Sequence, residues 1–197
     1  MKVFYPHEID AINAFLDEGR ILAVPTETVF GLCVKYDNFS AVTKLMKLKQ
    51  REMGSGKVFA LMVFAKTEIA RFATVSALAQ TIIDKYLPGE LTIVLPKNPD
   101  FKNQYFDNFT TVGLRVPNHQ FLQKLLEKTG ALMMTSANLR GEAPARTFTE
   151  ALTLPMDGII RGAAGGGEPT TVVAVDDKIK VLRQGKIHFK VLLHNCP

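Results

Sequence analysis

Basic and hydroxyl side chains stand where apolar segments of this sequence end, and such positions can bind a small anionic molecule. Arg115 lies inside the apolar segment TVGLRVP, and Thr135-Ser136-Ala137-Asn138 follows the apolar run ALMM. Because an unpaired charge in an apolar strand is costly, Arg115 requires a carboxylate partner or an anionic ligand. The crevice at the carboxyl ends of strands is where α/β sheets bind ligands, and hydroxyl and amide groups suit a polar one. These residues predict a site for a small molecule that bears phosphate.

Two further basic positions fit this pattern. Lys49-Gln50-Arg51 closes a predicted helix just before a loop, and Arg183 ends the segment VLR ahead of Gly185. Cations in the last turn of a helix also complement the helix dipole, so a solvated helix end is the simpler explanation of Lys49 and Arg51 taken alone. The repetition of such positions at the ends of predicted elements is what favours phosphate binding.

Other kinds of catalytic site find little support. Segment 53–58 (MGSGKV) lacks the first glycine and the Ser or Thr of a Walker phosphate loop, and the glycine-rich segment 162–167 does not open a helix. We interpret both as flexible turns. The histidines have no metal-ligand spacing to one another or to Cys33 and Cys196, and Ser136 lacks the hydrolase elbow Gly-x-Ser-x-Gly. Covalent catalysis is therefore disfavoured, and Cys33 is predicted to be a small core residue.

The elements that must position these side chains follow from hydrophobic periodicity. Helices are predicted at 6–19, 39–49, 74–86 and 118–128, with Ser40 as a candidate cap of the second. Strands are predicted at 21–24, 58–64, 91–95, 111–116, 131–136, 157–161, 170–175 and 178–183, with a turn PTETVFGL at 25–32 and a polar loop at 97–109. Alternating strands and helices indicate a layered α/β domain. Its sheet is expected to be mixed, because some connections are too short for parallel crossovers.

Length and composition limit the class of protein. The chain has 197 residues, 47% of them hydrophobic and 22% charged, which predicts one domain with an ordinary core. This apolar content excludes a disordered protein, and two cysteines exclude a disulfide scaffold. Without an apolar run of roughly 18–20 residues or a signal peptide, a cytoplasmic location is expected. The net charge of +5 favours anionic partners such as nucleotides or RNA without choosing among them.

A set of short motifs resembles the YrdC-like threonylcarbamoyl-adenylate synthases of the YrdC/Sua/YciO superfamily. The motifs are PTETVFGL at 25–32, KQR at 49–51, PGELT at 88–92, VGLRVP at 112–117, TSAN at 135–138, Gly141, Pro144, PTTVV at 169–173 and LRQG at 182–185. They stand in the family's order and cover nearly the whole chain. The resemblance implies an α/β (α+β) fold in which a twisted mixed β-sheet flanked by helices forms an open ligand cleft. It also implies a single YrdC-like domain over 1–197, with its core at about 6–189.

The activity implied by the resemblance is that of an L-threonylcarbamoyladenylate synthase, which is a nucleotidyltransferase. Such enzymes make threonylcarbamoyl-AMP and pyrophosphate from ATP, L-threonine and bicarbonate or CO2, for the threonylcarbamoyladenosine modification of tRNA. The implied partners therefore include these substrates and downstream tRNA-modification proteins, with Mg2+ arriving on the ATP. Binding to tRNA or double-stranded RNA is a further possibility, and no membrane partner is implied.

The functional residues implied by the resemblance fall into two groups. The group implied to bind ATP is Lys49, Arg51, Thr111, Ser136, Asn138 and Arg183. Lys49 and Arg51 are also implied to be catalytic, because they would offset charge as pyrophosphate leaves. The group implied to bind threonine is Thr26, Thr28, Arg115, Thr135, Thr170 and Thr171. Arg115 would hold the carboxylate in a bidentate fork, and no protein side chain is implied to hold the metal.

The sequence departs from the family's pattern at three places, and a second function stays open. Residues 52–59 (EMGSGKVF) replace a proline-containing stretch, which leaves the role of Lys57 open; Thr170 replaces a usual serine, and Arg140 stands where serine is frequent. The alternative is a non-catalytic YrdC-like protein that binds tRNA or double-stranded RNA through its basic charge. Against it, the chain has no Trp and no aromatic residues interleaved with basic ones.

Overall fold

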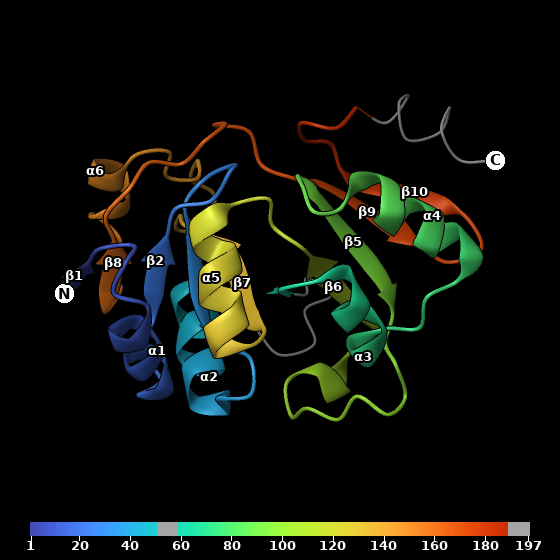
Figure 1. The fold of residues 1–197 in the computed structure, drawn as a ribbon, viewed down its shortest axis with the longest axis horizontal. Helices are drawn as coiled ribbons and strands as arrows, with labels where there is room; N and C mark the ends of the chain where they lie inside the picture. The colour runs from blue at the N-terminus through green and yellow to red at the C-terminus, as the bar shows by residue number, and fades with distance from the viewer. Residues whose placement is uncertain (51–58, 189–197) are drawn as a thin grey trace.

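One sheet of ten strands organises the chain, in the order β1-β8-β2-β3-β7-β4-β6-β5-β9-β10 (Figure 1). The structure is a computed structural model that describes residues 1–50 and 59–188. The strands are β1 Lys2–Phe4, β2 Leu22–Val24, β3 Gly31–Lys35, β4 Ala60–Met62, β5 Leu91–Pro96, β6 Thr111–Arg115, β7 Leu132–Ser136, β8 Gly158–Ile160, β9 Thr171–Val175 and β10 Ile179–Arg183. The helices are α1 Ile9–Asp17, α2 Phe39–Leu48, α3 Ile69–Phe72, α4 Ala77–Tyr86, α5 Gln120–Thr129 and α6 Phe148–Ala151, with short 3-10 turns η1 Lys66–Glu68 and η2 Phe106–Asn108.

The sheet is mixed, as the short connections predict. Strands β1 and β2 pair in parallel with β8, β4 with β6, and β5 with β9. Antiparallel pairs join β3 to β2 and β7, β4 to β7, β5 to β6, and β9 to β10. With helices packed against this twisted sheet, the predicted α/β architecture is confirmed.

The central strands are buried on both faces of the sheet. On one face, Leu22 and Cys33 pack with the apolar sides of α1 and α5. On the other face, Ala23 and Leu32 pack with α2, α3 and α4. This two-sided burial explains the continuous apolar run at 21–24. It also confirms Cys33 as a core residue, and burial raises the pKa of its thiol to about 12.

Nearer the β10 edge, the face that carries α1 and α5 lines a cavity instead of a helix interface. Along β6, Val112 and Leu114 point into the core, whereas Thr111, Gly113 and Arg115 line the cavity. Successive strand residues point to opposite faces, so one strand serves the core and the cavity alternately. Met62 and Met134 belong both to the cluster under α1 and α5 and to the cavity wall, which makes the two regions continuous.

Some elements differ from the predictions. Strand β3 starts inside the predicted turn at 25–32, and α3 and α6 are too short to show a helical period in the sequence. The cap of α2 is Asn38 and not Ser40, because Asn38 Oδ1 accepts the N–H of Ala41 at 3.0 Å. Strand β1 is not predicted from the sequence, and its Phe4 is fully buried.

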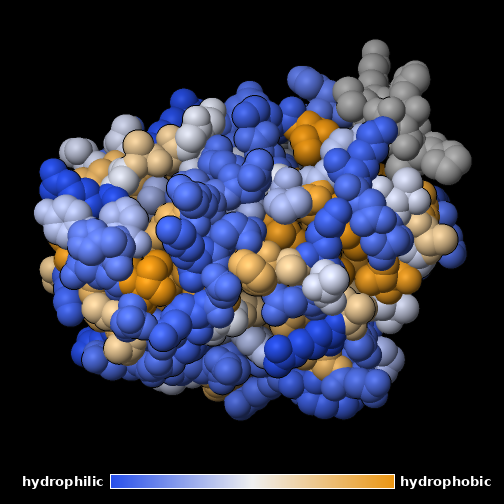
Figure 2. All heavy atoms as spheres, in the orientation of Figure 1, coloured by the Kyte–Doolittle hydropathy of each residue, from blue (hydrophilic) through white to orange (hydrophobic). Residues whose placement is uncertain are grey.

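The surface is largely polar. In Figure 2, hydrophilic residues cover most of the visible face, and hydrophobic residues reach the surface in patches between them, including the region between α5 and β5. Among residues 1–50 and 59–188, no helix is long and apolar enough to cross a membrane.

The approach of Gly185 to the start of β9 generates a stability prediction. A Cβ at Gly185 would lie 2.3 Å from the carbonyl oxygen of Pro169, so Gly185→Ala must displace backbone. We expect the free energy of unfolding to fall by about 1–3 kcal/mol, measured by denaturant unfolding. In the control Gly113→Ala, the nearest atom, Ala60 Cα, is 3.6 Å away, and stability should stay within about 0.5 kcal/mol. Equal stability of the two variants would contradict the close approach.

Candidate active site

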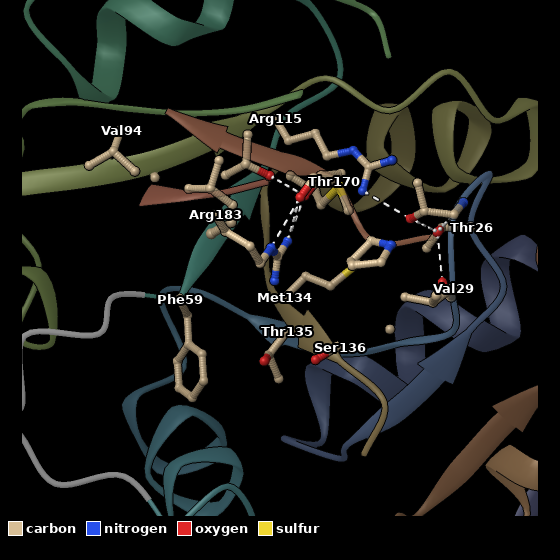
Figure 3. A pocket seen from close by; sticks show the side chains of 18 of the residues that line it. Thr26, Val29, Phe59, Val94, Arg115, Met134, Thr135, Ser136, Thr170 and Arg183 are labelled. Carbon is tan, nitrogen blue, oxygen red and sulfur yellow. Dashed lines mark hydrogen bonds between the residues drawn. The ribbon is translucent and has the colours of Figure 1, made fainter. Parts of the chain in front are cut away.

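A cavity of about 370 Å³ lies against the sheet face formed by β4, β6, β5 and β9 (Figure 3). The turn between β2 and β3, the end of β7 and the strand β10 complete its walls. The polar residues of the lining are Thr26, Thr28, Thr92, Thr111, Arg115, Thr135, Ser136, Thr170 and Arg183. The apolar residues include Val29, Phe59, Met62, Val94, Met134, Val172 and Leu182. The described lining therefore offers a ligand hydroxyl groups, two guanidinium groups and apolar surface.

Arg115 is nearly buried in the cavity wall, with 5% of its side chain exposed. Its Nε donates to the carbonyl oxygen of Gly89 at 3.0 Å, and its Nη1 donates to Thr28 Oγ1 at 3.4 Å. Its Nη2 lies 2.7 Å from Glu27 Oε1. Burial lowers the pKa of the Arg115 guanidinium, and the negative charge of Glu27 opposes this shift. Of the two alternatives that the sequence leaves for Arg115, a carboxylate partner or an anionic ligand, the structure provides the carboxylate of Glu27.

The hydroxyls of Thr26 and Thr28 form a hydrogen-bond chain with one direction. Thr26 donates its proton to the carbonyl oxygen of Val29 at 2.7 Å and accepts the N–H of Thr28 at 3.0 Å. The two hydroxyl oxygens are 2.9 Å apart, so the proton between them must come from Thr28. Since Arg115 donates to the same hydroxyl, Thr28 retains one acceptor position and no proton to give. A ligand group beside Thr28 is therefore bound through its own N–H or O–H.

The glycine-rich segment 162–167 packs on this turn, which corrects its interpretation as a flexible turn. The N–H of Gly165 donates to the carbonyl oxygen of Thr26 at 2.9 Å, and Gly167 donates to that of Thr28, also at 2.9 Å. A Cβ on Gly165 would lie 3.0 Å from the carbonyl oxygen of Glu27. Glycine allows this close approach of two backbones, and the approach fixes the turn that carries Thr26 and Thr28.

Arg183 and Thr170 form a second polar group in the cavity (Figure 3). Arg183 donates to the carbonyl oxygen of Thr170 from Nε at 3.1 Å and from Nη2 at 2.9 Å. Nη2 also donates to Thr170 Oγ1, which is 2.9 Å from Thr92 Oγ1. Burial and the charge of Arg115 lower the pKa of the Arg183 guanidinium. The two cations therefore act on the same space, which favours an anionic ligand.

Lys49 contacts the loop that follows β7 and is not among the lining residues. Its buried Nζ donates to the carbonyl oxygens of Ser136 and Asn138 at 3.0 and 2.5 Å, and to Asn138 Oδ1 at 2.7 Å. The hydroxyl of Ser136 donates to the same Oδ1 at 2.7 Å. Lys49 thus fixes the backbone and side chains of the loop from which Ser136 faces the cavity.

The cavity brings together most of the site residues predicted from the sequence. Those that line it are Thr26, Thr28, Thr111, Arg115, Thr135, Ser136, Thr170 and Arg183. Lys49 and Asn138 lie beside it through their bonds to Ser136. The predicted place of Thr171 at the threonine end is not found, because its hydroxyl bonds Gly185 and Ile187 and it is absent from the lining. Arg51 and Lys57 lie outside the described residues.

No site role is predicted from the sequence for Glu27 or Thr92, but Glu27 contacts Arg115 and Thr92 lines the cavity. Glu27 stands inside the motif PTETVFGL, but nothing in the sequence links it to Arg115, which lies far along the chain. For Thr92, the alternation within the strand was an available signal. Its neighbours Leu91 and Ile93 are core residues, so Thr92 must face the opposite side of the sheet.

The fold and the cavity define an α/β protein whose cavity presents guanidinium and hydroxyl groups. The chain belongs to the Sua5/YciO/YrdC family, whose model, described as "Telomere recombination", matches residues 14–185. The threonylcarbamoyl-AMP synthase of Photobacterium profundum is 35% identical over 182 residues, which cover 90% of this chain and 98% of the relative. A putative threonylcarbamoyl-AMP synthase of Methanocaldococcus jannaschii is 33% identical over 179 residues, covering 88% of this chain and 84% of the relative.

Solved structures share the fold. Sua5 of P. abyssi complexed with L-threonine matches 98% of this chain with a TM-score of 0.88 at 23% identity. YciO of E. coli matches 94% of this chain and 96% of its own length with a TM-score of 0.83 at 26% identity. The chain spans 59% of the length of the P. abyssi protein.

The contacts of Lys49 generate a second stability prediction. Lys49→Met keeps much of the side-chain volume but removes the donor to three buried or partly buried oxygens. Because unpaired buried acceptors are costly, we expect the free energy of unfolding to fall by about 2–3 kcal/mol in denaturant unfolding. Lys47→Met, at an exposed position of the same helix, is the matched control and should change it by less than about 0.5 kcal/mol. A Lys49→Met variant as stable as this control would refute the assigned contacts.

His119 generates a prediction about pH. Its Nδ1 accepts the N–H of Leu122 at 3.4 Å and so caps α5. Burial lowers the pKa of His119 below the usual 6.5. The negative charge of Glu27 opposes this shift, and the positive charge of Arg115 adds to it. The stabilisation by neutral His119 is therefore complete above the unfolded-state pKa and is lost as the pH falls. His119→Asn keeps a capping oxygen without titrating, so its free energy of unfolding should rise relative to wild type from about pH 7 to about pH 5. The measurement is urea unfolding of both proteins, and a difference between their free energies of unfolding that does not vary with pH would contradict the capping role of neutral His119.

Proposed function

We propose that this chain is a threonylcarbamoyl-AMP synthase, which joins L-threonine, CO2 or bicarbonate and ATP into threonylcarbamoyl-AMP and pyrophosphate. The observation that carries the proposal is one cavity lined by two guanidinium groups and several hydroxyl groups. It occurs in a chain that is similar over nearly its whole length to proteins named threonylcarbamoyl-AMP synthase. An amino acid has a carboxylate for one guanidinium, and a nucleotide has phosphates for the other.

Threonine is assigned to the part of the cavity around Arg115. Nε and one Nη1 proton of the guanidinium make hydrogen bonds to described residues, and Nη2 lies against Glu27, so the second Nη1 proton remains for a carboxylate. Thr28 accepts a hydrogen bond from the ligand, which suits the amine or the hydroxyl of threonine. The family resemblance assigns Thr26, Thr135 and Thr170 to threonine as well, and Thr170 also bonds Arg183.

ATP is assigned to the part of the cavity around Arg183. The hydroxyls of Ser136 and Thr111 and the guanidinium of Arg183 face the space available for a nucleotide. Lys49 and Asn138 shape the loop that carries Ser136, so Lys49 contributes positive charge and loop geometry together. By the family resemblance, Arg51 joins Lys49 in offsetting charge as pyrophosphate leaves.

The reaction then needs positioning and charge neutralisation more than an activated side chain. The amine of threonine attacks the carbon of CO2, forms an N–C bond and loses a proton to solvent, which gives a carbamate. A carbamate oxygen attacks the α-phosphorus of ATP, and the bond to the bridging oxygen of the β-phosphate breaks as pyrophosphate leaves. Holding both substrates in one small cavity lowers the entropic barrier, and the cations stabilise the phosphate charge that develops.

Magnesium is assigned to the nucleotide. In the described residues no group of three His, Cys, Asp or Glu side chains could hold a metal ion, and the cavity offers hydroxyls. This donor set fits an Mg2+ ion that arrives with ATP and keeps phosphate and water ligands, because Mg2+ is usually bound through substrate phosphates and few protein groups. The ion would neutralise triphosphate charge together with Arg183 and Lys49.

The product defines the partners. Threonylcarbamoyl-AMP is an activated donor, and we propose that downstream tRNA-modification proteins transfer its threonylcarbamoyl group to adenosine in tRNA. Because ATP and tRNA are both found in the cytoplasm, we propose that location for the protein. We also propose that residues 1–197 act as one YrdC-like domain.

The proposal predicts threonine-dependent release of pyrophosphate from ATP in the presence of bicarbonate and Mg2+. Arg115→Ala should lower kcat/KM for L-threonine by at least about 30-fold, because a buried charged donor to the substrate is lost. Arg115→Lys keeps the charge without the fork and tests the same role if the alanine variant is unstable. Arg20→Ala, at an exposed site, is the control and should behave as wild type.

Two outcomes would count against the synthase. Folded wild-type protein without threonine-dependent pyrophosphate release would reject it. A non-catalytic RNA-binding protein would instead bind double-stranded RNA with an affinity that falls steeply with salt and does not change in Arg115→Ala.

A further inference from the structure

Glu27 contacts the guanidinium of Arg115 without lining the cavity. It stands between Thr26 and Thr28, which both line the cavity, whereas Glu27 does not. Its Oε1 lies 2.7 Å from Arg115 Nη2 and accepts the backbone N–H of Asn118 at 2.7 Å. Its side chain is 13% exposed. Glu27 therefore approaches Arg115 from the side away from the ligand space.

The contact between Glu27 and Arg115 leaves a donor for a ligand. Arg115 Nη2 and Glu27 Oε2 are both buried and make no directed hydrogen bond to any described residue. The ion pair is thus a single close contact through Oε1 and not the fork in which two N–H groups meet two oxygens. Nη2 is buried against Glu27, so the second Nη1 proton is the donor that remains for a ligand carboxylate, and the charge of Glu27 meanwhile compensates the buried guanidinium.

Glu27 is itself held in place on its other sides. Its backbone packs closely against the glycine-rich segment, because a Cβ on Gly165 or Gly166 would lie 3.0 Å from the Glu27 carbonyl oxygen. Glu90, the other acid whose charge acts on Arg115, bonds Lys186 at 2.7 Å. Among the described residues, Glu27 is therefore the acid that contacts Arg115, and its own position is fixed before any ligand binds.

We propose that Glu27 is a positioning residue that orients Arg115 for the carboxylate of the amino-acid substrate. This rests on the proposed function, because it takes threonine as the ligand of Arg115. The role is distinct from binding the substrate, since Glu27 acts through Arg115. It makes the protein's preference for a ligand with a carboxylate depend on a side chain that the ligand does not touch.

The experiment compares Glu27→Ala and Glu27→Gln with wild type. It measures KM for L-threonine and for ATP in the pyrophosphate assay, and the Kd of L-threonine and of L-threoninol, which lacks the carboxylate, by calorimetry. For Glu27→Ala we expect KM and Kd for L-threonine to rise about tenfold or more, with KM for ATP within about twofold. The preference for L-threonine over L-threoninol should fall by a similar factor. Glu27→Gln, which keeps an oxygen for Arg115 and Asn118, should lie between wild type and Glu27→Ala.

A matched control and the contrary outcomes separate this role from others. Glu127→Ala removes an exposed glutamate of α5 and should leave all four constants unchanged. Equal preference for L-threonine in wild type and both Glu27 variants, or a parallel rise of both KM values, would overturn the positioning role while the synthase function stands. Wild-type protein that binds L-threonine no better than Arg115→Ala would overturn the threonine assignment and this role together. If Glu27→Ala does not fold, the preference of Glu27→Gln for L-threonine over L-threoninol tests the positioning role instead.

Discussion

One buried guanidinium constrains how this part of the molecule is built. Arg115 projects from β6, whose Val112 and Leu114 lie in the core, and its charge is tolerable only with acceptors and an opposite charge around it. The turn after β2 supplies a carboxylate and a hydroxyl, and Gly89 supplies a carbonyl oxygen ahead of β5. The glycine-rich segment then fixes the turn by backbone contacts. Segments distant in the sequence are thus positioned relative to one another by their contacts with the single side chain of Arg115.

One face of the sheet is covered by helices over some strands and lines the cavity over others. Helices α1 and α5 cover one face over the central strands, and the same face over β4, β6, β5 and β9 lines the cavity. The opposite face is packed throughout, so the floor of the cavity rests on a continuous core. Small residues at Ala60 and Gly113 leave room in this floor, while neighbouring threonines and Arg115 bring polar groups to it.

Local patterns in the sequence were sufficient for the core and for most of the lining, and insufficient for contacts between turns. Arg115 could be singled out because a charge in an apolar strand needs a partner, yet the partner could not be named, since Glu27 is brought to it only by the fold. The same limit applies to the glycines at 165–167, whose composition indicates a flexible turn, because their bonds reach Thr26 and Thr28 only in the folded chain. Thr171, the first residue of β9, bonds Ile187 through its hydroxyl, and its neighbour Thr170 lines the cavity, a difference that the motif alone does not reveal.

The one-way hydrogen-bond chain from Arg115 through Thr28 and Thr26 limits which synthetic inhibitors this end of the cavity accepts. An ether or ketone oxygen placed beside Thr28 would set lone pair against lone pair, and rotating the hydroxyl to relieve this would break its bond to Thr26. An amine, an amide N–H or an alcohol at the same place would complete the chain. Compounds for this cavity are therefore best built around a hydrogen-bond donor at Thr28 and an anionic group at Arg115, and their selectivity would come from polarity more than from shape.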